Sequence, residues 1–198
     1  MKILLSITLM LLSFARMAAA FNAPDFSFTH YTTENILPSN NVRDIVQDDE
    51  GYMWFATDGG LVRFDGSSSK VFVPGMPGNA DFFMLSLCNT PDGLLVGSDA
   101  RLYCFDSRKE KLTEMSLKYP EDIKERVEGA VTDICVDSAG DIWVSVEQKG
   151  VFRISSKGDV LSFQDFPQVM NFIGMLYVDP SDIAVSYTHL TLPTKLEV

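Results

Sequence analysis

The sequence is poor in the residues from which most catalytic and metal sites are built. It has 2 histidines and 3 cysteines among 198 residues, the histidines do not cluster, and no Cys-x-x-Cys pair occurs. A zinc site is therefore not expected. A nucleophile elbow, a phosphate-binding glycine loop and a zinc-binding histidine pair are missing as well. These absences favour a protein that is not an enzyme, and they predict no metal and no other cofactor.

Basic residues are also few. Lys and Arg number 16 against 27 Asp and Glu, which gives a formal net charge of −11, and no basic run occurs. Because nucleic acids and anionic membrane surfaces attract basic patches, neither is expected as a partner of this segment. After the first 20 residues, no stretch approaches the roughly 20 apolar residues that a membrane-spanning helix requires.

The N-terminus has the pattern of a secretory signal peptide. Lys2 is followed by an apolar core over residues 3–14, and Ala18, Ala19 and Ala20 form a small-residue cleavage site. The apolar core is too short for a comfortable membrane span. The sequence therefore predicts export, with cleavage before Phe21.

The stretch that follows reads as short strands separated by turns. Val42–Gln47 is rich in β-branched residues, residues 48–51 form an Asp/Gly turn, and Met53–Thr57 is apolar and aromatic. Residues 58–60 turn again, and residues 61–64 continue as a third strand. This order predicts a β-meander.

The same pattern returns twice. Its marker is the first turn glycine, which is Gly51, Gly93 and Gly140, at spacings of 42 and 47 residues. Trp54 and Trp143 each stand three residues after their glycine. Repeats of about 40 to 50 residues with four short strands are typical of β-propeller blades, each of which buries its faces against its neighbours.

The three cysteines fit this repeat. Cys88 and Cys135 each lie five residues before their marker glycine, and Cys104 lies on the third strand of the second copy. Equivalent positions on neighbouring blades favour buried thiols over a Cys88–Cys135 disulfide.

Three residues are candidate ligand contacts. A second turn glycine, Gly60 or Gly150, opens the third strand of the first and third copies, and Arg63 and Arg153 follow at equivalent places on these apolar strands. Met76 lies in a Pro/Gly-rich loop of the kind that carries ligand contacts in many folds. The competing interpretation pairs each arginine with a neighbouring turn carboxylate and makes the loop a connector.

The predicted fold class is therefore all-β, with about three and a half four-stranded propeller blades that form an incomplete propeller. The fourth copy begins with a strand near residues 170–178, and the repeat stops after Val185. We expect the tail from Ser186 to be non-native sequence. The predicted divisions are a signal peptide (1–20), an N-terminal strand and lead-in (21–40), blade 1 (41–80), blade 2 with a charged excursion (81–129), blade 3 (130–168), the start of blade 4 (169–185) and the tail (186–198).

The first copy resembles a known repeat. Residues 29–42, followed by Asp-x-x-Gly-x-x-Trp-x-x-Thr-x-x-Gly-Leu-x-Arg-Phe-Asp over residues 48–65, are similar to the two-component regulator propeller repeat. The resemblance extends over about residues 26–185. The second copy departs from it, with Leu95 or Val96 at the tryptophan position and Cys104 at the arginine position.

The resemblance implies the N-terminal periplasmic sensor region of a Bacteroides-type hybrid two-component sensor histidine kinase. It further implies an oligosaccharide ligand bound by the complete propeller, control of polysaccharide-utilisation genes, a homodimeric full-length receptor attached to the inner membrane, and a kinase located outside this chain. Two alternatives remain open at this point. One is a secreted propeller enzyme, such as a lyase or a glycosidase, and the other is a binding or scaffold propeller without signalling.

Overall fold

The computed structural model describes residues 27–75, 82–118, 128–163, 175–178, 184–187 and 194–195. The predicted signal peptide, the candidate contact Met76 and the centre of the charged excursion lie outside these ranges. The chain divides into two units, residues 1–30 and 31–198, and the second holds the strands. The N-terminal strand expected within residues 21–40 is not found at residues 27–40. Part of this range instead forms a turn, in which the amides of Asn35 and Ile36 bond to the carbonyl of Thr32 at 3.1 Å.

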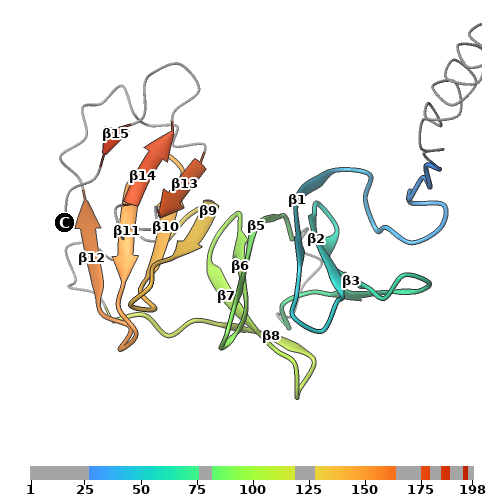
Figure 1. The fold of residues 1–198 in the computed structure, drawn as a ribbon, viewed down its shortest axis with the longest axis horizontal. Helices are drawn as coiled ribbons and strands as arrows, with labels where there is room; N and C mark the ends of the chain where they lie inside the picture. Colours follow the sequence, from blue (N-terminus) through green and yellow to red (C-terminus); the bar gives the residue numbers. More distant parts are fainter. Residues whose placement is uncertain are drawn as a thin grey trace, which may run out of the picture. The chain divides into compact units, whose positions relative to one another are not determined.

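The second unit consists of antiparallel meanders (Figure 1). In each of the three four-stranded sheets, strands that follow one another in the chain pair side by side. This order confirms the prediction of an all-β fold made of four-stranded propeller blades. Blade 1 contains β1 (Val42–Gln47), β2 (Met53–Thr57), β3 (Gly60–Phe64) and β4 (Ser69–Phe72). Blade 2 contains β5 (Met84–Thr90), β6 (Gly93–Ser98), β7 (Leu102–Asp106) and β8 (Lys111–Glu114), and blade 3 contains β9 (Val131–Val136), β10 (Ile142–Val146), β11 (Gly150–Ile154) and β12 (Val160–Phe163).

A fourth sheet begins at β13 (Met175–Val178) and continues with β14 (Ala184–Tyr187) and β15 (Thr194–Lys195). The sequence predicted that the repeat stops at Val185. In the structure β14 continues through Ser186 and Tyr187, and β15 pairs with Val185 and Ser186. The first residues of the expected tail thus take part in a strand, because backbone hydrogen bonds do not require the Asp/Gly turn on which the prediction relied.

Hydrophobic cores lie between successive blades. Trp54 of blade 1 packs against Phe105 of blade 2, with ring centroids 4.7 Å apart. The core between blades 2 and 3 includes Leu95 and Phe152, and Trp143 of blade 3 packs with Leu176 of β13. Each blade therefore buries its apolar surface against its neighbours, as expected for a propeller.

The first strands of successive blades contact one another and are joined by hydrogen bonds. These bonds come from one repeated position, occupied by Asp44, Ser86 and Asp133, where a register shift interrupts each first strand. Asp44 accepts a bond from the amide of Leu87 at 2.7 Å, and Asp133 accepts one from the amide of Leu176 at 2.5 Å. Ser86 donates its hydroxyl to the carbonyl of Val131 at 2.9 Å. The position directly after the register shift thus ties blade 1 to blade 2, blade 2 to blade 3 and blade 3 to β13.

Candidate ligand-binding site

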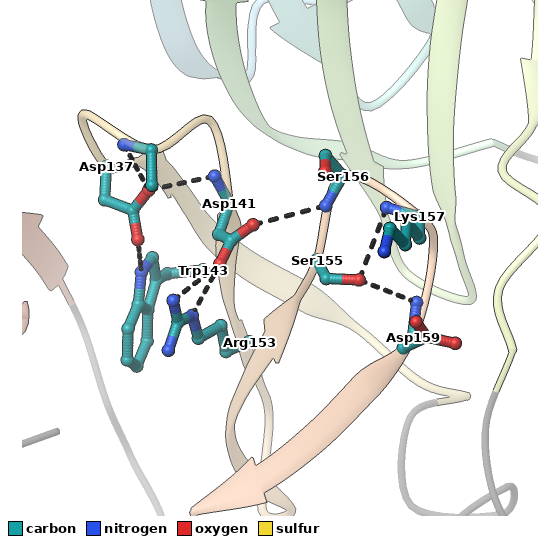
Figure 2. A network of polar contacts seen from close by, with 9 residues as sticks. Asp137, Asp141, Trp143, Arg153, Ser155, Ser156, Lys157 and Asp159 are labelled. Atoms are coloured by element: carbon teal, nitrogen blue, oxygen red, sulfur yellow. Dashed lines mark hydrogen bonds and ion pairs between the residues drawn. The ribbon is translucent and has the colours of Figure 1, made fainter.

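A carboxylate at the start of the first turn organises blades 1 and 3. In blade 1, Asp48 accepts bonds from the amides of Glu50 and Tyr52 at 3.0 and 2.9 Å, and from the indole N–H of Trp54 at 2.7 Å. The same three bonds recur in blade 3, around Asp137, at 3.1, 2.9 and 2.9 Å (Figure 2). The repeated Asp and Trp are therefore two halves of one clamp that closes the turn and orients the indole.

Blade 2 lacks both halves of this clamp. Its first hairpin is one residue shorter, with Thr90 paired to Gly93, so the register places Leu95 opposite Cys88 and Cys104. Leu95 therefore occupies the tryptophan position, and Thr90 occupies the aspartate position. Thr90 closes its own turn by donating its hydroxyl to the carbonyl of Gly93 at 2.7 Å.

Arg153, predicted as a ligand contact, lies in blade 3 beside the turn of its own hairpin. Its guanidinium binds the Asp141 carboxylate at 2.9 Å through Nε and at 2.6 Å through the second nitrogen, and it lies 5.6 Å from the Trp143 ring centroid. The other Asp141 oxygen accepts the amide of Ser156 at 3.2 Å. Figure 2 shows how this acid joins the β9–β10 turn to the β11–β12 turn. The charge of Arg153 is thus balanced within its blade by an acid whose side chain is 14% exposed.

Arg63 holds the equivalent place in blade 1 but has a different environment. Tyr52 stands where blade 3 has Asp141, and the Arg63 guanidinium lies 4.9 Å from the Tyr52 ring centroid. Its carboxylate partner is Glu110, which accepts a bond at 2.9 Å and belongs to the β7–β8 turn of blade 2. Arg63 therefore contacts an aromatic ring of its own blade and an acid of the next blade.

Glu110 also binds Lys70, through its second carboxylate oxygen. These hydrogen bonds, first from Lys70 and then from Arg63, lower the pKa of Glu110 below its ordinary value. Beside the two cations lies a depression. It is lined by Tyr52, Arg63, Asp65, Ser68, Ser69 and Lys70.

The carboxylate of Asp65, at the edge of this depression, is already occupied. It accepts bonds from the amides of Ser67 and Ser68 at 2.8 and 2.7 Å, and from both of their hydroxyls. These bonds, led by those from Ser68, lower the pKa of Asp65 well below its ordinary range. Asp65 therefore shapes the turn and leaves the balance of the Arg63 charge to Glu110.

The structure does not bring the two described candidates, Arg63 and Arg153, together. Arg63 and Arg153 hold equivalent places on separate blades, and Met76 lies outside the described residues. The remaining members of the Arg63 cluster, Tyr52, Lys70 and Glu110, were not among the predicted site residues. Tyr52 had a sequence signal, because it replaces the acid that stands four residues after the turn aspartate in the third copy. Glu110 had no such signal, because the second copy lacks both the Asp–Trp clamp and the arginine that the first and third copies have in common.

Other site types can be assessed within the described ranges. Among the residues described there, no group of three or more His, Cys, Asp or Glu side chains is placed to hold a metal ion. None of the helices searched in the same part of the chain is long and apolar enough to cross a membrane. Cys88, Cys104 and Cys135 are free thiols.

Comparison with known proteins identifies one repeat and the fold. The family described as "Two component regulator propeller" matches residues 36–59, which contain Asp48 and Trp54. No curated protein matches the sequence significantly.

Several solved structures are similar. One is the extracellular domain of a putative one component system from B. thetaiotaomicron, with a TM-score of 0.68 and 14% identity over 82% of this chain and 22% of that chain. Another is the extracellular domain of a putative hybrid two component system from the same organism, with a TM-score of 0.59 and 18% identity over 80% of this chain and 21% of that chain. A third is virginiamycin B lyase from Staphylococcus aureus, with a TM-score of 0.61 and 17% identity over 89% of this chain and 61% of that chain.

The chain thus spans about a fifth of the length of the first two structures. At these identities the likeness establishes a propeller fold. The same fold carries regulator domains and an enzyme, so it does not by itself assign an activity.

Proposed function

This chain carries a two component regulator propeller repeat, and from it we propose that the chain is part of the periplasmic ligand-sensing propeller of a hybrid two-component receptor. The observation that carries the proposal is the match at residues 36–59, whose Asp48–Trp54 clamp recurs in blade 3. Two of the similar structures are extracellular domains of putative one component and hybrid two component systems, which supports an exported sensor.

The ligand of this sensor is an oligosaccharide, and the output is expression of polysaccharide-utilisation genes. In the full-length receptor the propeller belongs to a homodimer attached to the inner membrane, with the kinase outside this chain. Binding to the complete propeller would shift the balance between two packings of the blades or protomers, and the ligand can do so only through a difference in affinity for the two. This segment itself catalyses no reaction.

The test combines binding with a cellular response. The purified periplasmic region is titrated calorimetrically with a panel of neutral and acidic oligosaccharides, and transcripts of the neighbouring genes are measured in cells that receive the same sugars. We expect heat for at least one sugar and induction by that sugar, which a deletion of the gene abolishes. Binding without a transcriptional response would favour a binding or scaffold propeller.

A second candidate function is a propeller enzyme, which the likeness to virginiamycin B lyase favours. It predicts that some of the same sugars, or a lyase substrate, are converted to new products during incubation with the protein. Chromatography and mass spectrometry of the reaction mixture detect such products. If this protein forms such products and a purified inactive control protein forms none, a catalytic function would replace the sensor proposal.

A further inference from the structure

The carboxylate of Glu110 lies between two cations of a neighbouring blade. One oxygen accepts the Arg63 bond at 2.9 Å, and the other accepts a bond from Lys70. The cations are 47 and 40 residues away in the sequence, so this contact depends on the packing of blade 1 against blade 2. An arrangement with two donors on one carboxylate is the way proteins bind carboxylate and sulfate groups of ligands.

The backbone of Glu110 is unusual. Its φ of 47° lies in the left-handed region, which residues other than glycine seldom occupy. The strained turn holds the acid over the two cations, and the Glu110 side chain remains 40% exposed. A partner held on an exposed, strained turn can be exchanged for another anion more readily than a buried one.

Blade 3 provides the internal comparison. There the equivalent arginine, Arg153, has its own blade's Asp141 as partner, and that acid is 14% exposed. In blade 1 the acid is replaced by Tyr52, whose ring offers an aromatic face instead of a charge. Blade 1 thus has an aromatic ring in place of the local acid, beside an arginine that lines a depression.

The surrounding charge also favours an anion. The turn that carries Glu110 contains Arg108 and Lys109, and Lys111 opens β8 directly after it. Glu110 joins this basic segment to Arg63 and Lys70. In a chain with a net charge of −11, these segments hold a local excess of basic residues, of which Lys109 is paired with Asp106 at 3.0 Å. Concentrated charge of one sign attracts ligands of the opposite sign and orients them.

We propose that Arg63, Lys70 and Tyr52 form a subsite for an acidic sugar, one that carries a carboxylate or a sulfate, and that Glu110 occupies this subsite when the sugar is absent. The sugar's anionic group replaces the Glu110 carboxylate on the two cations, and its ring lies against the Tyr52 side of the depression. This inference rests on the proposed sensing function and specifies the class of its ligand.

The test compares three probes on the full chain: a trimer of galacturonate, the neutral trimer of galactose, and inorganic sulfate. Affinities are measured by calorimetry at low salt. We expect the acidic trimer to bind the wild-type protein and the neutral trimer to bind at least 10-fold more weakly. Sulfate should bind weakly and compete with the acidic trimer. Equal affinity for both trimers, or sulfate binding with no sugar binding, would overturn the assignment of an acidic sugar.

Three substitutions locate the site. Lys70→Gln should weaken binding of the acidic trimer about 10-fold, and Glu110→Gln should strengthen it several-fold by removing the competing carboxylate. Arg101→Gln is the matched control, because Arg101 is an exposed arginine in an ion pair with Glu114 on blade 2, and it should leave binding unchanged. Thermal melts of each variant show that it is folded.

Failure of the inference and failure of the proposed function are distinguishable. If neutral sugars bind and Lys70→Gln and Glu110→Gln have no effect, sensing stands and the acidic subsite is wrong. If no sugar of either charge binds, the oligosaccharide ligand of the proposed function fails as well.

Discussion

The indole N–H of Trp54 donates to the carboxylate of Asp48 at 2.7 Å, across six positions of the sequence. Asp48 also accepts two backbone amides of the same turn. One acid thereby closes a hairpin and fixes the orientation of a tryptophan that is only 2% exposed. Because Trp54 lies in the core between blades 1 and 2, the turn and the packing of the blades depend on the same side chain.

Replacement of Asp48 tests this dependence. Asp48→Ala leaves the indole N–H and two amides without their acceptor, which should lower the free energy of unfolding by about 2 to 3 kcal/mol. Trp54→Phe keeps an aromatic ring and removes the one bond, so the loss should be smaller, about 1 to 2 kcal/mol. Urea denaturation followed by far-UV circular dichroism measures both.

Thr90→Ala in blade 2 serves as the comparison. It removes a single hydroxyl bond to Gly93, so its cost should be about 1 kcal/mol. A cost for Asp48→Ala no greater than for Thr90→Ala would show that the clamp is not a unit.

The spacing of glycines and tryptophans predicted the blades, because a propeller repeats its turn chemistry at a nearly constant interval. It could not decide between Leu95 and Val96, because the shortened hairpin of blade 2 shifts the register by one residue relative to Gly93. The sequence also predicted that Arg63 and Arg153 hold equivalent places on their blades. Their different partners could not be predicted, because the acid that binds Arg63 comes from a turn of the next blade.

The position on the first strands that links successive blades, occupied by Asp44, Ser86 and Asp133, has a sequence pattern that the sequence analysis did not use. The first and third copies share Val-x-Asp-Ile, over residues 42–45 and 131–134. A charged residue at the same place on two half-buried strands indicates a specific partner, here an amide of the next blade. Ser86 in the second copy concealed the pattern, because it makes its link with a hydroxyl donor in place of a carboxylate acceptor.

Gly97 lies where blades 2 and 3 approach each other closely. A Cβ at this position would lie 2.2 Å from Ser86 Oγ and 2.7 Å from the carbonyl oxygen of Val131, the two groups that form the link between these blades. Gly97→Ala should therefore separate the blades locally and lower the free energy of unfolding by about 2 to 3 kcal/mol. Urea denaturation measures the loss.

Gly66→Ala is the control for this substitution. Gly66 has a φ of 97° and no heavy atom within 4 Å of an added Cβ, so it tests backbone strain alone, at about 1 kcal/mol. Equal costs at the two glycines would contradict a steric role for Gly97.

The burial of the Asp133 carboxyl predicts that the stability of the protein depends on pH. Burial raises its pKa, although the amides of Leu176 and Ile134 act in the opposite direction. Because the folded state then holds the proton more tightly than the unfolded state, this group favours folding below the ordinary aspartate pKa of 3.8. That contribution is lost as the pH rises through the higher folded pKa.

Asp133→Asn removes this titration. The wild-type protein should lose more stability than the variant between pH 4 and pH 7, as measured by urea denaturation at each pH. Asp44, Cys88, Cys135 and Asp137 are the titratable groups that act on this part of the molecule, and they are identical in both proteins. Parallel stability profiles of the two proteins would contradict the prediction.

Two thiols on the first strands of blades 2 and 3 should be inert at neutral pH. Burial, together with the nearby carboxylate of Asp133, raises the pKa of Cys88 to about 11 and that of Cys135 to about 12, from an ordinary value of 9.0. A rise of two units leaves roughly 100-fold less thiolate, and the thiolate is the reactive form. In a Cys104→Ser variant, which retains only these two thiols, the reaction with a disulfide reagent at pH 8 should therefore be at least 100-fold slower than that of the same chain in urea. Fast reaction of the folded variant would mean that β5 and β9 open to solvent far more readily than the packing of blades 2, 3 and 4 implies. It would also weaken the account of the links that Ser86 and Asp133 make between the blades.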